Sequence, residues 1–183
     1  MTRVIIIGGT GMLSHASREI SHVVDELLLI SRNPDTLAKD IGARSLRLDW
    51  KEKNAVNASI CSLKNEPKAD ILISWIHEDG LWCLPLFEDL LIKGGCSIRI
   101  HGSAVGDPAE GIKTDPTPRA DIFRQNVVLG WMEEDSGQRW LTDHEICEGV
   151  LTAFKYPEKT SITVGHIDSR EVSMVKTPTF NKL

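Results

Sequence analysis

Short apolar runs and amphipathic stretches alternate along most of the chain. Residues 3–7 form a β-branched run in which polar and apolar side chains do not alternate, and this is typical of a parallel strand covered on both faces. The next stretch carries apolar residues at spacings of three and four, which predicts an amphipathic helix over residues 12–24. A glycine-rich turn separates the two, so the chain opens with a strand, a turn and a helix.

The alternation continues to the end of the chain. Further strands are predicted over residues 26–31, 44–48, 69–76, 96–101, 126–131 and 161–167. Predicted helices cover residues 34–41, 52–64 and 81–93, the last stopped by Gly94 and Gly95. A final helix begins at Thr142, which forms a capping-box signature with Glu145. We therefore expect an α/β fold, a Rossmann-like, doubly wound and mainly parallel sheet of six or seven strands with helices on both faces.

The length of the chain fits one domain. The 183 residues, 41% of them hydrophobic, are enough for a single core. We expect one domain over residues 1–183, with a cofactor-binding half at residues 1–103 and a C-terminal strand and helix region at residues 120–183. Residues 102–119 contain three prolines and three glycines, which predicts a long functional loop between the two parts.

Charge and cysteine spacing exclude several classes of partner. The net charge of −5 and the lack of a basic cluster argue against nucleic acid. The apolar runs are far shorter than the roughly 20 residues that a membrane helix needs, so neither a membrane anchor nor a signal peptide is predicted. The four cysteines are widely spaced without a C-x-x-C pair, so we expect reduced thiols in the cytoplasm and no metal site.

The turn Gly8-Gly9-Thr10-Gly11 carries the chemistry that the sequence shows best. A helix N-terminus presents free N–H groups and a positive dipole end to an anion, provided that no side chain blocks the approach. Glycines between a strand and a helix meet this condition and predict a dinucleotide pyrophosphate site. Ser14 stands at the third position of the fingerprint, where glycine is usual. The alternative is a purely structural turn or a degenerate site.

The residues around this turn resemble the short-chain dehydrogenase/reductase superfamily. Val-Ile-Ile-Ile-Gly-Gly-Thr-Gly-Met-Leu at residues 4–13 is similar to the opening of its atypical members, which have a Gly-x-x-Gly-x-x-Gly turn. Ser-Trp-Ile-His at residues 74–77 and Arg-Trp-Leu-Thr at residues 139–142 resemble short bacterial proteins of this type. The similarity covers the cofactor half well, to about Ser103. It implies a nicotinamide cofactor more directly than it implies a reaction.

The glycine turn and the resemblance together give a set of expected cofactor contacts. The resemblance implies a basic residue for the 2′-phosphate of NADP at Arg32, an adenine contact at Asp49, and backbone beside the cofactor ribose at Ser74. The alternatives are a solvated charge for Arg32 and a loop or N-cap residue for Asp49. The full set is Gly8, Gly9, Thr10, Gly11, Met12, Leu13, Ser31, Arg32, Asp49 and Ser74.

The end of the second strand indicates which dinucleotide binds. NAD-specific sites carry an acidic residue there, about 20 residues beyond the glycine turn, which accepts hydrogen bonds from the ribose hydroxyls. This chain has Ser31 and Arg32 at that place and no acid. A serine hydroxyl and a guanidinium can both bind a phosphate. NADP(H) is therefore expected in preference to NAD(H).

The usual catalytic pair of the superfamily is missing from the sequence. The resemblance implies a Tyr-x-x-x-Lys motif, yet the single tyrosine, Tyr156, comes after the last predicted helix without a lysine at that spacing. Three other residues follow predicted strand ends, where ligands bind in open α/β sheets: His77, His101 and Ser103. A histidine can donate a proton near neutral pH, and a serine can orient a carbonyl group. The alternative for each is an ordinary hydrogen-bonded residue at a strand end.

Two functions from different classes remain open at this stage. The first is a small NADP(H)-dependent oxidoreductase that acts on a carbonyl compound or a similar small molecule, with a second copy of the chain supplying a missing wall of the pocket. The second is a non-catalytic NADP(H)-binding protein, either a redox sensor or a regulatory protein, which would need no catalytic pair. Arg139 also has two interpretations, as a ligand for a phosphate or carboxylate, or as the partner of Glu133, Glu134 or Asp135.

Overall fold

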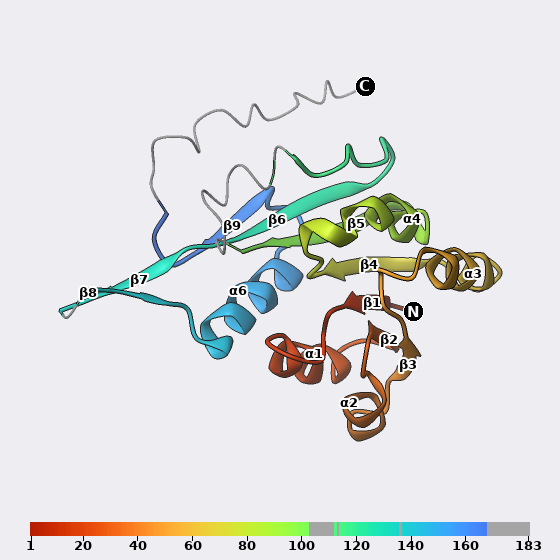
Figure 1. Cartoon of the computed structure of the whole chain (residues 1–183), viewed down its shortest axis with the longest axis horizontal. Helices are drawn as coiled ribbons and strands as arrows, with labels where there is room; N and C mark the ends of the chain where they lie inside the picture. Colours follow the sequence, from red (N-terminus) through yellow and green to blue (C-terminus); the bar gives the residue numbers. More distant parts are fainter. Residues whose placement is uncertain (103–111, 113, 136, 168–183) are drawn as a thin grey trace.

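The chain forms a seven-stranded parallel sheet (Figure 1). The structure, a computed structural model, describes residues 1–102, 112, 114–135 and 137–167. The strands of the sheet, in spatial order, are β3 (Arg44–Arg47), β2 (Glu26–Ser31), β1 (Arg3–Ile7), β4 (Ala69–Ser74), β5 (Leu91–His101), β6 (Phe123–Leu129) and β9 (Ser161–Val164). Every neighbouring pair is parallel. The chain first winds outward from β1 to β3 and then from β4 to β9, so the direction reverses between β1 and β4. The predicted doubly wound Rossmann-like fold is confirmed.

Helices cover both faces of the sheet. One face packs against α1 (Ser14–Ser21), α2 (Asp35–Asp40) and α6 (Asp143–Lys155), and the other against α3 (Lys53–Leu63) and α4 (Leu84–Glu88). Successive residues of β1 point to opposite faces, so Val4 and Ile6 join the first core while Ile5 and Ile7 join the second. All four are buried, which explains why this strand shows no polar alternation in the sequence.

The prediction of a helix over residues 81–93 is wrong. The segment forms a 3₁₀ turn, η1 (Glu78–Cys83), then the short α4, and by Leu91 the chain has entered β5. Leu91 pairs with Ala69 of β4, and the register then shifts so that Cys96 faces Ile71. Gly94 therefore lies in an irregularity of the strand, with φ +80°, and does not end a helix. A short leucine-rich run suits a buried strand as well as a helix, and sheet pairing decided between them.

A hairpin beyond the sheet was not predicted. The sixth strand was expected over residues 126–131, but β6 ends at Leu129, and the chain then forms β7 (Trp131–Glu134) and β8 (Gly137–Trp140). These two pair in antiparallel fashion and extend past the N-terminus of α6 (Figure 1). The signal in the sequence was Gly137, whose φ of +122° allows the chain to reverse.

Several other predictions can be compared with the described residues. The capping box of α6 is confirmed, because Thr142 Oγ1 accepts the Glu145 N–H while the Glu145 carboxylate accepts the Thr142 N–H. All four cysteines are free thiols, and three of them are buried. No helix in the described ranges is long and apolar enough to cross a membrane. Residues 103–111, 113 and 168–183, and with them most of the predicted loop and Ser103, lie outside the described part of the chain.

Candidate functional site

A groove of about 830 Å³ lies at the carboxyl ends of the strands. Its floor and walls come from the residues that follow β1 to β6, from η1, and from the first turn of α6. The residues after β1 and after β4 both contribute to it, and these are the strands between which the sheet changes direction. Open α/β sheets bind their ligands at this place. Of the residues predicted for the site, Met12, Arg32, Asp49, His77 and His101 line this groove.

The glycine turn leaves space in front of α1. A Cβ atom built on Gly11 meets no atom within 4 Å, and Gly11 does not have a positive φ. The backbone N–H groups of Gly11 and Met12 have no hydrogen-bond acceptor among the described residues. Unpaired N–H groups at the start of a helix favour an anion. The geometry therefore fits the pyrophosphate group that the sequence predicted.

The other two glycines of the turn are required because neighbouring atoms leave no room for a side chain. Gly8 has φ +78°, and a Cβ there would lie 2.6 Å from the backbone oxygen of Trp75. A Cβ on Gly9 would lie 2.7 Å from both Ile6 Cγ2 and the Ser17 hydroxyl oxygen. These two positions hold β1, the end of β4 and α1 together. Leu13, which was expected at the cofactor, is buried in the core. Through this packing it helps to position α1 on the sheet.

The end of β2 presents one free cation to the groove. Arg32 is exposed, and no acidic side chain lies at ion-pairing distance from it within the described ranges. The Ser31 hydroxyl is buried and lies 3.1 Å from the Thr10 hydroxyl, so these two side chains bind each other across the turn. Asp35, the nearest following acid, accepts a hydrogen bond of 2.8 Å from Ser45 of β3. Asp35 therefore has its own partner on the neighbouring strand.

Asp49 and His77 lie just beyond the ends of β3 and β4, and Ser74 is the last residue of β4. Asp49 accepts a hydrogen bond from the Lys51 N–H at 3.0 Å, which makes it a turn residue that also faces the groove. Ser74 is fully buried beside β1, and its hydroxyl has no partner among the described residues. His77 is exposed in the groove, with its ring edge-on to Trp75 at 5.8 Å between centroids. Its imidazole is therefore accessible to a ligand.

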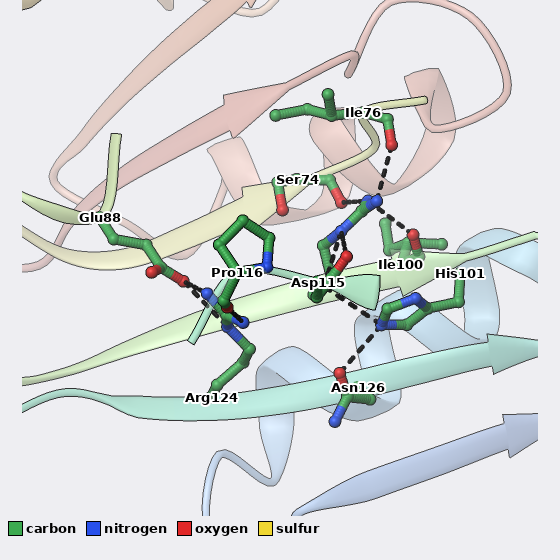
Figure 2. Close-up of polar contacts among 10 residues, drawn as sticks. Ser74, Ile76, Glu88, Ile100, His101, Asp115, Pro116, Arg124 and Asn126 are labelled. Carbon is green, nitrogen blue, oxygen red and sulfur yellow. Dashed lines mark hydrogen bonds and ion pairs between the residues drawn. The ribbon is translucent and has the colours of Figure 1, made fainter. Parts of the chain in front are cut away.

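His101 belongs to a buried polar cluster, drawn in Figure 2. Its Nε2 lies 2.9 Å from Asn126 Oδ1 and 3.8 Å from Asp115 Oδ2. Arg99 donates through Nε to the same Asp115 carboxylate at 3.2 Å, and through Nη2 to the Ile76 carbonyl at 2.7 Å. Burial lowers the pKa of His101, although the Asp115 charge opposes this. Burial therefore favours the neutral form of this imidazole, which is held in the floor of the groove and is less accessible than that of His77.

The Arg99–Asp115 pair also fastens a later segment onto the sheet. The two side chains are 6% and 4% exposed. Neighbouring Pro116 accepts a hydrogen bond from Arg124, which pairs with buried Glu88 at 2.6 Å. Asp115 and Pro116, near the end of the predicted loop, are thus bound to β5 by one buried ion pair and to β6 by a hydrogen bond.

Replacing Asp115 with alanine is expected to destabilise the fold by about 3–5 kcal/mol, because it leaves the Arg99 guanidinium buried without its carboxylate. The measurement is the free energy of unfolding in urea. The matched control is Asp40→Ala, which breaks an exposed pair with Arg18 and should cost less than about 1 kcal/mol. Equal losses in the two variants would contradict the structural role of Asp115.

The sequence did not indicate several residues of the groove. Trp50, Trp140, Asp143, Arg99 and Asp115 all line it, and Trp140 is 65% exposed. They come from a loop, a hairpin and buried positions that only the fold brings together.

Of the two interpretations of Arg139, the ion pair is confirmed for Glu134. The guanidinium also makes two hydrogen bonds of 2.9 Å to Glu145, an acid outside the expected set. The same contacts hold the pKa of Glu145 at about 2. With both acids bound to it, the Arg139 guanidinium stabilises the junction between β8 and α6.

Comparison with known proteins gives structural but not sequence matches. No protein-family model matches the chain, and no curated protein matches it. Among solved structures, BdcA in complex with NADPH matches with a TM-score of 0.56 and 14% identity over 93% of this chain and 97% of that one. A short-chain dehydrogenase/reductase from Serratia marcescens matches with a TM-score of 0.58 and 14% identity over 90% and 97%. The NADH-dependent reductase A1-R′ complexed with NAD matches with a TM-score of 0.61 and 14% identity over 90% of this chain and 95% of that one.

The chain therefore shares the Rossmann-like fold of these solved structures. The position of Tyr156 bears on whether it can act on a ligand. Helix α6 begins at the groove, and Tyr156 caps the opposite end of that helix. Thirteen helical residues separate the two ends by roughly 20 Å. The ammonium groups of Lys155 and Lys159 lie 5.6 and 4.8 Å from the centroid of the tyrosine ring. Tyr156 therefore cannot reach a ligand in the groove.

Proposed function

We propose that the chain is an NADP(H)-dependent oxidoreductase that acts on a small carbonyl compound or the corresponding alcohol. The observation that carries the proposal is the open space at Gly11, in a turn with unpaired N–H groups that leads directly to Met12 of the groove, at the switch point of the sheet. Structural neighbours in complex with NADPH and with NAD support the choice of a nicotinamide cofactor. Two of the reported neighbours, A1-R′ and the Serratia marcescens protein, carry the word reductase in their names, and this favours an enzyme over a non-catalytic binding protein.

Six of the predicted residues have a role in this proposal. The N–H groups of Gly11 and Met12 bind the pyrophosphate, and Arg32 binds the 2′-phosphate. Asp49 lies where the adenine ring would rest, and the end of β4 at Ser74 runs beside the nicotinamide ribose. The cofactor supplies or accepts a hydride when it is bound. Within the chain, His77 is the accessible group that can donate a proton to a carbonyl oxygen during reduction.

The proposal is tested by two measurements on the wild-type chain. A binding titration with NADPH should saturate at one molecule per chain, and a panel of aldehydes and ketones should reveal consumption of NADPH. Tight binding without consumption across the panel would instead indicate a sensor or regulatory protein. Failure to bind either dinucleotide would reject the proposal as a whole.

The preference for NADP(H) depends on Arg32. Arg32→Ala should weaken NADPH binding by about tenfold to over a hundredfold, because a charge-assisted hydrogen bond is worth about 1.5–3 kcal/mol. Binding of NADH, which has no 2′-phosphate, should change little. Combining Arg32→Ala with Ser31→Asp should reverse the preference, since the new carboxylate repels a phosphate and accepts bonds from ribose hydroxyls.

The control for this series is Arg18→Ala. Arg18 is an exposed arginine in the last turn of α1, where it pairs with Asp40, and it lies outside the groove, so its loss should leave both affinities unchanged. All titrations must be made at one ionic strength, because salt screens the interaction with phosphate. Equal affinities of the wild-type chain for NADPH and NADH would show that Arg32 is only a solvated surface charge.

A further inference from the structure

Three metal-binding side chains meet where α1 packs against α6. His15 comes from the first turn of α1, and His144 and Glu148 come from the first two turns of α6. Each offers one ligand atom, and these atoms all lie within 4.8 Å of one another. The two imidazole rings are tilted by 47° with their centroids 5.6 Å apart. All three side chains are exposed, so an ion from solvent can reach them.

The backbone beneath the cluster is fixed by a buried cysteine. Cys147 is fully buried between the helices, and its Sγ accepts the Ala16 N–H at 3.4 Å and donates to the Met12 carbonyl at 3.1 Å. His15 directly precedes Ala16, and Glu148 directly follows Cys147. His144 and Glu148 are four residues apart, which places them on the same face of α6. The ligand-bearing residues are therefore held in register by a contact in the core.

The three side chains have no other partner in the described part of the chain. No hydrogen bond or ion pair engages the Glu148 carboxylate or either imidazole. The neighbouring Glu145 differs in this respect, since it is bound both to Arg139 and to the start of α6. Two imidazoles and one carboxylate thus face one another with their lone pairs free.

We propose that His15, His144 and Glu148 form a divalent transition-metal site that takes Zn²⁺, with water in the fourth position. Two imidazole nitrogens and one carboxylate oxygen are a ligand set that Zn²⁺ accepts, and imidazoles disfavour Mg²⁺ and Ca²⁺. Tetrahedral coordination needs ligand atoms roughly 3.4 Å apart, given bonds of about 2.1 Å. Exposed side chains reach this spacing by small rotamer changes. The Glu148 charge offsets the positive ends of the two helices.

This site is independent of the proposed oxidoreductase function. Cysteine spacing led the sequence analysis to expect no metal, and the distance in sequence between His15 and His144 concealed the cluster. The metal would cross-link α1, which follows the glycine turn, to α6, whose first turn lines the groove. Its expected effect is therefore to stabilise the packing of these two helices against each other.

The test uses the untagged full chain after treatment with a chelator, with the exposed Cys61 replaced by serine. Calorimetric titration with Zn²⁺ should show one ion per chain, and Co²⁺ should give the visible absorption of a four- or five-coordinate site. His15→Ala, His144→Ala and Glu148→Gln should each weaken Zn²⁺ binding at least tenfold, since even outer-shell partners are worth about 10–100-fold. Zn²⁺ should raise the Tm of the parent chain and of none of these variants.

The matched control is His22→Ala. His22 is also an exposed histidine next to α1, but it lies at the other end of the helix and outside the cluster. Its replacement should leave Zn²⁺ affinity and the Co²⁺ spectrum unchanged. Circular dichroism checks that each variant is folded, which is expected because all the replaced side chains are exposed. A parent chain that binds no Zn²⁺, or cluster variants that bind it as tightly as the parent, would overturn the proposal.

Discussion

Gly11→Val is expected to abolish dinucleotide binding and to leave the chain folded. A Cβ on Gly11 meets nothing within 4 Å, so the valine side chain has room in the unliganded protein. That room is the place of the pyrophosphate, and the branched side chain would separate the phosphate oxygens from the N–H groups of Gly11 and Met12. The loss of two charge-assisted hydrogen bonds, each worth about 1.5–3 kcal/mol, lowers affinity by about a hundredfold or more.

The control for this variant is a second glycine in the same turn. In Gly9→Val the new side chain would meet Ile6 and Ser17, with Cβ distances of 2.7 Å, so this variant should lose about 1–3 kcal/mol of stability or more. The two variants therefore separate binding from folding. The measurements are NADPH titration and urea unfolding of both. Unchanged NADPH affinity in folded Gly11→Val would show that the glycine turn does not hold a pyrophosphate.

His77→Ala is expected to lower kcat by about 100-fold to 10,000-fold, which is the usual contribution of a general acid. NADPH affinity should change little, because the proposal places the imidazole at the substrate carbonyl and not at the phosphates. His77 is exposed in the groove, whereas His101 is held by Asn126 in its floor. The measurement is steady-state turnover with the best substrate of the carbonyl panel, together with NADPH titration.

The control is again His22→Ala, an exposed histidine outside the groove, which should retain full turnover. Full turnover in His77→Ala would contradict the role given to this residue. It would move the proton donor to the other predicted candidates, His101 and Ser103. Of these, His101 faces the groove from a buried position, and Ser103 lies outside the described residues.

The part of the fold nearest the glycine turn could be predicted well from the sequence. Strands β1 and β2 have the predicted bounds, because uninterrupted apolar runs between turn residues suit strands that are covered on both faces. The prediction was wrong over residues 81–93, where a leucine-rich run entered β5. Local pattern cannot separate a short buried helix from a buried strand, and pairing of Leu91 with Ala69 is a tertiary contact.

The residues of the candidate site could likewise be predicted only in part. Residues that directly follow strands, such as Arg32 and His77, could be found because parallel strands end at one edge of the sheet. Asp115 and Trp140 could not be found in this way. Asp115 is held at the groove by a buried ion pair, and Trp140 reaches the groove through a hairpin that was not predicted. Ser31 was expected to face a phosphate, and its pairing with Thr10 indicates that Arg32 carries more of the preference.

The most direct test of the central claim is a crystal structure of the full chain with NADPH. We expect the pyrophosphate against the N–H groups of Gly11 and Met12, the 2′-phosphate beside the Arg32 guanidinium, and the nicotinamide ring in the groove near His77. A dinucleotide bound outside the groove, or one whose pyrophosphate lies away from Gly11, would contradict the account.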